Sequence, residues 1–271
     1  MIIDFHAHMF PEKIAGSTIA KLAPFNEEKP TTDGTILGLL KAMEEGNCDL
    51  AITLPVLTKP SQYESVTKFT IETNQQFKGK KIIAFGGIHP LCENIFEKMK
   101  YLKDNGIKGV KIHPDYQGEF IDHEGYIEIL ESAKKLDMIV ITHSGIDGAY
   151  LDQPERCPPD RLVKVIDRVK YNKFVLAHYG AKLQWEEVLE LIAGKDVYLD
   201  TACMLRTISF DLFNKILLKH GEDKILFATD CPWSSIKLDS ERLNSFNLSK
   251  ETKDKIFYKN ALKLLGLKNE Y

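Results

Sequence analysis

Two histidines separated by one residue stand near the start of the chain, in the run Asp4-Phe5-His6-Ala7-His8. Side chains alternate between the two faces of a strand, so both imidazoles would point the same way. Two imidazoles on one face of a strand end can chelate a metal ion. A pair of hydrogen-bonded core histidines would leave the same pattern, so this motif alone is compatible with both interpretations. Asp4 is expected to face the same way as His6 and to accept a hydrogen bond from it.

Ligand-capable side chains recur at the same end of other apolar runs. The side chains that follow or close such runs are His89, His113, His143, His178 and Asp230. Burying several unpaired polar groups at one end of a sheet is costly, which favours a shared ion over unrelated core histidines. His123 and His220 fall in helical or connecting segments and are expected at the surface.

Eight short apolar runs rich in Ile, Val, Leu and Phe alternate with amphipathic segments. The predicted strands are 2–5, 50–56, 81–88, 107–112, 138–142, 173–177, 197–200 and 224–229. The predicted helices are 35–45, 62–77, 92–104, 123–135, 160–170, 185–193, 209–220 and 250–265.

This order predicts an α/β fold, a (β/α)8 TIM barrel in which residues 1–271 form a single domain. A doubly wound open sheet is the competing architecture, but it normally carries a glycine-rich phosphate loop, and the sequence has no G-x-G-x-x-G. The long connections 9–34 and 144–159 follow strands. In a barrel they would lie at the C-terminal rim, where substrate sites form.

The composition is that of an ordinary globular protein. Lys and Arg number 36 and Asp and Glu 39, for a formal net charge of −3, and 44% of the residues are hydrophobic. This balance argues against a nucleic-acid surface and against a polybasic membrane tether. No apolar run is long enough to span a bilayer, and no signal peptide is expected. The five cysteines are scattered without a C-x-x-C, which favours a reducing cytoplasm.

Four motifs in order carry a family resemblance. They are the H-x-H pair, Thr-His-Ser-Gly at 142–145, Ala-His-Tyr-Gly-Ala at 177–181 and Ala-Thr-Asp-Cys-Pro-Trp at 228–233. Together they resemble the amidohydrolase superfamily, most closely the amidohydrolase-related branch that includes aminocarboxymuconate-semialdehyde decarboxylase. The resemblance extends from the first strand to the Asn-Ala-Leu at 260–262.

The resemblance implies a metal-dependent enzyme. It implies that His6, His8, His143 and Asp230 bind one divalent ion, with Zn2+ expected, and that His178 is a catalytic histidine beside the substrate. Three imidazoles and one carboxylate would leave a position open for water, whose pKa a zinc ion lowers. Asp230 would accept the proton of that water and pass it to a leaving group. His178 would stabilise developing negative charge or act as a second base.

Lys111 leaves the number of ions open. It shares a face of the fourth predicted strand with His113. In binuclear relatives a fourth-strand lysine is carboxylated and bridges two ions, in which case His143 and His178 would bind the second ion. One ion is the favoured interpretation. Lys111 is otherwise structural or pairs with a substrate carboxylate.

The expected partner is a small molecule, with a carboxylate among the candidates, and neither nucleic acid nor membrane; a homodimer is compatible with the sequence. The candidate substrate residues are His89, Lys111, His113, Arg156, Arg206 and Trp233. The leading expectation is a hydrolase of a small amide, lactone or related carbonyl compound. The alternative is a decarboxylase of a small unsaturated or aromatic acid.

Two other functional classes fit the sequence less well. A TatD-type phosphoesterase or nuclease would need a metal-bridging acid in mid-chain and a basic groove, and a net charge of −3 gives it no support. A non-enzymatic binding protein would lack at least one of the four ligands.

Overall fold

The computed structural model describes residues 1–26 and 28–268. Nine parallel strands follow one another along the chain in two hydrogen-bonded groups, β1-β2-β3 and β4 to β9. They are β1 (Ile3–Ala7), β2 (Leu50–Thr53), β3 (Lys81–Ala84), β4 (Gly86–Gly87), β5 (Gly109–Ile112), β6 (Ile139–Thr142), β7 (Phe174–Leu176), β8 (Tyr198–Asp200) and β9 (Ile225–Leu226).

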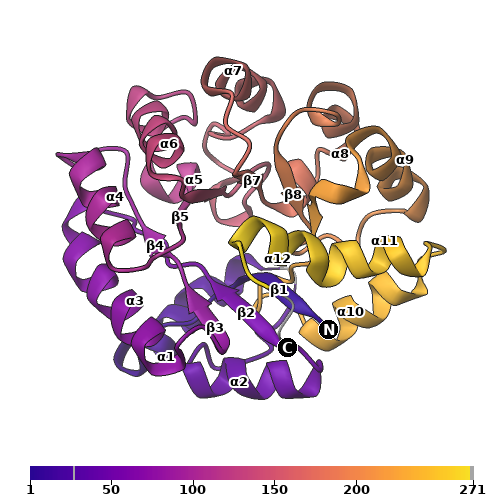
Figure 1. Ribbon diagram of the computed structural model, residues 1–271, viewed down its shortest axis with the longest axis horizontal. Helices are drawn as coiled ribbons and strands as arrows, with labels where there is room; N and C mark the ends of the chain where they lie inside the picture. Colours follow the sequence, from indigo (N-terminus) through magenta and orange to yellow (C-terminus); the bar gives the residue numbers. More distant parts are fainter. Residues whose placement is uncertain (27, 269–271) are drawn as a thin grey trace.

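The two groups close into one barrel. β3 and β4 are two parts of the third predicted strand, which is interrupted only at Phe85, and the amide of Phe85 still donates to the carbonyl of Thr53 at 2.9 Å. On the other side the amide of Phe5 donates to the carbonyl of Phe227 at 2.9 Å. Figure 1 shows the resulting ring of strands with helices around it. The eight-stranded barrel is therefore confirmed, and the open sheet is not.

Helices cover the outside of the barrel. The longer ones are α1 (Glu12–Leu22), α2 (Ile36–Glu45), α3 (Tyr63–Phe77), α4 (Ile95–Asp104), α6 (Glu124–Leu136), α7 (Pro159–Val169), α9 (Phe210–His220) and α10 (Ile236–Ser245). Short helices are α5 (Pro114–Gln117), α8 (Trp185–Glu187), α11 (Lys250–Asp254) and α12 (Asn260–Leu265). None of the helices in the part of the chain that the structure describes is long and apolar enough to cross a membrane.

Two of the longer helices were not predicted. α1 lies in the segment 9–34, where its flanking prolines suggested a loop; Pro11 precedes the helix and Pro24 follows it, so neither removes an internal hydrogen bond. α10 begins after Ser235, whose hydroxyl accepts a hydrogen bond from the amide of Leu238 at 3.3 Å.

The interior of the barrel is apolar at one end and polar at the other. Ile3 and Phe5 of β1 pack in the interior with Leu262 and Leu265 of α12, which lies across the barrel in Figure 1. The buried polar side chains gather at the opposite, carboxyl end of the strands. The fold thus positions the site at the rim that the long connections surround.

Candidate metal centre

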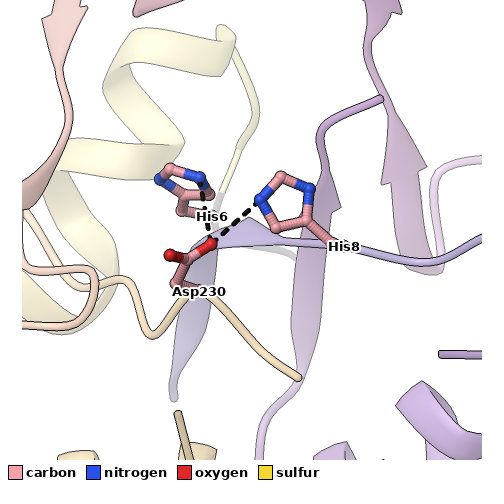
Figure 2. A group of neighbouring side chains, drawn as sticks. All are labelled: His6, His8 and Asp230. Carbon is pink, nitrogen blue, oxygen red and sulfur yellow. Dashed lines mark ion pairs between the residues drawn. The ribbon is translucent and has the colours of Figure 1, made fainter. Parts of the chain in front are cut away.

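Three of the four expected ligands come together at the rim. Nε2 of His8 lies 2.9 Å and Nε2 of His6 3.4 Å from Oδ1 of Asp230 (Figure 2). The backbone fixes this approach, because the amide of Asp230 donates to the carbonyl of His6 at 2.7 Å and the amide of His8 donates to the carbonyl of Cys231 at 2.6 Å. Asp230 has a positive φ of 70°, which turns the chain just after β9.

The hydrogen bonds of these histidines identify the nitrogens that lack a proton. Nδ1 of His8 lies 2.7 Å from the carbonyl of Leu54, which can only accept, so that nitrogen carries the proton. Nδ1 of His6 lies 2.9 Å from a carboxylate oxygen of Asp200 and donates in the same way. With Nδ1 occupied in this way, each ring directs its Nε2 at Asp230, whose Oδ1 has no assigned hydrogen bond among the described residues. Three converging acceptors fit a divalent cation.

Asp4 does not support His6 as expected. Its carboxylate accepts hydrogen bonds from the hydroxyl of Thr229 at 2.6 Å and from the backbone amides of Thr229 and His6. The pairing of β1 with β2 shifts by one residue between Asp4 and Ala7, so the side-chain alternation is interrupted. Asp4 is fully buried with these partners, and burial raises its pKa to about 7. Asp200, which received no role from the sequence, holds the His6 ring instead.

Lys111 lies inside the same cluster. Its side chain is 1% exposed, and its Nζ is 3.1 Å from Nε2 of His6. Burial lowers the pKa of this amine to about 8 against the opposing effect of Asp200 and Asp230. A partly deprotonated amine beside the proposed metal ligands could be carboxylated and bridge two ions, or it could form a hydrogen bond to His6.

His143 and His178 form a second imidazole pair beside the first. Nε2 of His178 lies 3.0 Å from Nδ1 of His143, and Nδ1 of His178 lies 3.0 Å from the carbonyl of Ala202. The rings of His6 and His178 are 5.6 Å apart. Burial lowers the pKa of His178 to about 3 and that of His143 well below its usual range, so both imidazoles are neutral at neutral pH.

The structure thus places His143 apart from His6, His8 and Asp230. Its Nε2 approaches Asp115 and Asp147 at 3.9 and 4.0 Å, and Nε2 of His113 lies 3.4 Å from Asp147. His113, His143 and Asp147 form a second group of closely spaced ligand atoms. However, the rings of His113 and His143 stack at 4.1 Å with their planes 6° apart. Because the lone pair of an imidazole nitrogen lies in the ring plane, this pair is not oriented to share one ion.

The remaining candidate substrate residues are not all free to bind substrate. His89 is buried, and its Nδ1 accepts a hydrogen bond from the amide of Leu91 at 3.1 Å. Arg156 donates to Gln153 and lies 3.9 Å from Asp115. Arg206 pairs with Glu28 and Asp239. Trp233 lines a hollow at the rim beside Arg206.

A family model described as Amidohydrolase matches residues 3–267. The chain belongs to the amidohydrolase family. No curated protein matches its sequence.

Solved structures share the barrel of this chain. An uncharacterised TIM-barrel protein from Bordetella bronchiseptica is 15% identical with a TM-score of 0.79, and 98% of each chain is covered. The 2,6-dihydroxybenzoate decarboxylase from Rhizobium is 16% identical with a TM-score of 0.69, again over 98% of each chain. The 5-carboxyvanillate decarboxylase from Novosphingobium aromaticivorans, complexed with manganese and 4-hydroxy-3-methoxy-5-nitrobenzoic acid, is 15% identical with a TM-score of 0.74, over 98% of this chain and 96% of that one.

The electrostatics of the candidate site keep its carboxylates ionised and most of its imidazoles neutral. Burial alone would raise the pKa of Asp230, but His6, His8 and His178 hold it well below its usual range. The pKa of Asp200 is likewise lowered, by His6 above all, against the effect of burial. The site therefore holds ionised carboxylates beside neutral imidazoles, which is the protonation state that metal binding requires.

Sequence reasoning left out four residues of this site. Asp115 and Asp147 face His143, Asp200 holds His6, and Lys182 stands at the rim with Trp233. Asp200 ends a predicted strand exactly as the histidines do, so its position was a usable signal. Asp147 and Lys182 sit in irregular rim segments, where no periodicity marks which side chains turn inward.

Proposed function

We propose that this protein is a metal-dependent carboxy-lyase that removes a carboxyl group from a small unsaturated or aromatic acid. The observation that carries this proposal is the convergence of the Nε2 atoms of His6 and His8 on Oδ1 of Asp230. The structural likeness to decarboxylases that act on 2,6-dihydroxybenzoate and 5-carboxyvanillate supports the reaction type.

In the metal-bound protein His6, His8 and Asp230 would hold the ion. His143, the fourth expected ligand, lies apart from them with Nδ1 bonded to His178, and would have to release that bond to join them. An N/O ligand set of this kind suits Zn2+ and also Mn2+, the ion in the 5-carboxyvanillate decarboxylase structure. When bound, the ion supplies positive charge that polarises the substrate and stabilises developing negative charge. Asp200 and the carbonyl of Leu54 keep the two first-strand imidazoles in the tautomer that can ligate.

Decarboxylation replaces a carbon–carbon bond with a carbon–hydrogen bond, so the site must deliver one proton to carbon. Asp230 is ionised and its Oδ1 faces the cluster without a donor, so it can receive a proton from the substrate and return it to the carbon. His178 stays neutral at neutral pH and holds its bare Nε2 next to the same space. It is proposed to position the substrate or to accept a proton from it.

Hydrolysis of an amide or lactone is the second candidate, favoured by the match to the amidohydrolase family model. The same residues would serve both reactions. The products separate them: a decarboxylase releases carbon dioxide, and a hydrolase forms a new carboxylate without carbon dioxide. We expect carbon dioxide from purified, metal-loaded protein given a panel of hydroxybenzoates, and the proposal fails if only hydrolysed amides or lactones appear.

Elemental analysis tests the ion itself, with His6→Ala as the matched control. About one equivalent of zinc or manganese in the wild type and a loss in the variant would support the single-ion centre. Two equivalents would instead indicate carboxylated Lys111, with His143 and His178 on the second ion. No metal in either protein after supplementation would overturn the enzyme proposal.

A further inference from the structure

A small hollow at the rim lies next to the proposed metal centre. Its volume is about 50 Å³, and its lining includes the cations of Lys182 and Arg206, the acids Glu28 and Asp239, and the side chains of Cys203 and Trp233. The thiol of Cys203 donates to the carbonyl of Thr229 at 3.8 Å, and burial together with the charge of Asp230 raises the pKa of the thiol. Cys203 thus links the hollow to the segment that carries Asp230. The volume of the hollow suits a few water molecules or one carboxylate group, and not a whole aromatic ring.

Lys182 is fixed at the edge of this hollow by its backbone. Its amide donates to the carbonyl of Ser144 at 2.9 Å, and its carbonyl accepts from the amide of Ile146 at 3.1 Å. Gly145 lies between these two bonds with a φ of 82°, and a Cβ there would come within 2.0 Å of the backbone nitrogen of Lys182. The glycine thus permits a close backbone contact that holds the lysine in place.

The ammonium of Lys182 differs from the neighbouring guanidinium groups in having no counter-charge in contact among the described residues. Arg206 is neutralised by Glu28 and Asp239, and Arg156 lies against Asp115. The side chain of Lys182 forms neither a hydrogen bond nor an ion pair within residues 1–26 and 28–268, although the residue is partly buried. Its charge nevertheless reaches the site, since it helps to lower the pKa of His143 and His178.

Lys182 is a partly buried cation that lines this hollow and has no partner among the described residues, and such a group suits a bound anion. We propose that Lys182 binds a second, non-reacting carboxylate of the substrate, in the hollow beside Asp230. This inference rests on the proposed function and narrows it: the substrate is a small acid with two anionic groups, one at the ion and one at Lys182. Trp233 would cover the apolar part between them.

The test compares two probes that differ by one carboxylate, isophthalate and benzoate, bound to the metal-loaded protein and measured by isothermal titration calorimetry. We expect wild type to prefer isophthalate by about tenfold or more, as a charge-assisted hydrogen bond provides. Lys182→Gln should reduce the ratio to within about twofold, and Lys182→Arg should keep part of it, because the charge is retained. The matched control is Lys237→Gln, an exposed lysine on α10, which should behave as wild type.

The proposal is overturned if Lys182→Gln keeps the wild-type ratio, or if wild type shows no preference or binds neither probe. A thermal melt separates binding from folding, because the ammonium has no partner to lose and the variant should unfold as wild type does. Metal content and carbon dioxide release report on the proposed function independently. If Lys182 determines the preference for isophthalate but no carbon dioxide is released, the proposed function is disproved and the anion site stands. If carbon dioxide is released without that preference, the anion site is disproved and the proposed function stands.

Discussion

The imidazoles of His143 and His178 meet end to end, with Nδ1 of His143 3.0 Å from Nε2 of His178. Because Nδ1 of His178 donates to the carbonyl of Ala202, its Nε2 must accept, and His143 is the donor. This leaves Nε2 of His143 bare, buried and without a partner among the described residues. A cation bound at Nδ1 would move the proton to Nε2, where the carboxylates of Asp115 and Asp147 lie.

Replacing Asp115 by asparagine tests this tautomer shift. The carboxylate should stabilise the Nε2 proton of a ligating His143, so Asp115→Asn should weaken manganese binding by about 10-fold or more. The unfolding temperature without metal should not fall, because the buried Oδ2 of Asp115 has no donor to lose. Competition with a chromophoric chelator measures the affinity. Asp152→Asn, an exposed position in the segment 144–159 that carries Asp147, is the control, and equal affinities in the two variants would contradict the idea.

Lys111 should make metal affinity depend on pH. Its pKa lies at about 8, below the ordinary 10.5, so below pH 8 the ammonium donates to Nε2 of His6 and competes with the ion. Apparent affinity for manganese should therefore rise as the pH increases from about 7 to about 8 and level off above that. The histidines contribute little in this window, because His6, His143 and His178 have lowered pKa values.

Lys111→Met removes the competing ammonium, so its affinity should be flat over the same pH window. Titrations at several pH values in the same buffer series give both curves. A variant that retained the wild-type rise would show that another group binds the proton.

Asp200 should matter for both folding and metal binding. One carboxylate oxygen accepts from Nδ1 of His6, and the other accepts from the amides of His178 and Ala202. In Asp200→Asn the side-chain amide would face the proton of His6, so we expect a loss of about 2–3 kcal/mol in the free energy of unfolding. Urea denaturation measures it. The surface change Asp196→Asn should cost less than about 1 kcal/mol, and a similar loss in both would refute the assigned role.

Asp230→Asn should separate activity from stability. The amide can donate to Nε2 of His8, 2.9 Å from the present oxygen, so the metal-free variant should unfold at the same or a higher temperature. Turnover should fall by about 100-fold or more, because the group that moves the proton is gone. Calorimetry and a carbon dioxide assay check the two effects. Full activity in this variant would disprove the proton-transfer role.

Much of the fold followed from apolar patterning, because strands buried on both faces leave continuous apolar runs that the sequence displays directly. The predictions failed for segments whose structure is determined by contacts with distant parts of the chain. His220 was expected at the surface, but it is 8% exposed, with Nε2 3.0 Å from the carbonyl of Val197 and Nδ1 accepting from the amide of Gly194. A histidine that satisfies the backbone of a neighbouring segment carries no local signal of that contact.

The site residues, too, could be predicted only in part. His6, His8 and Asp230 could be grouped because strand ends of a barrel converge. The local shift in register that turns Asp4 away from His6 could not be predicted, since a one-residue irregularity leaves no mark in the apolar pattern. The partner of His6 thus comes from β8, nearly 200 residues away along the chain, at Asp200.

The position of α12 has a consequence for the order of events during synthesis. Ala261, Leu262 and Leu265 complete the apolar interior that begins with Ile3 and Phe5. Until residues 260–265 have left the ribosome, the apolar side chains at one end of the barrel stay exposed to water. The first strand must therefore wait for the last helix, and a nascent chain of this protein is exposed to chaperones and proteases for almost the whole time of its translation.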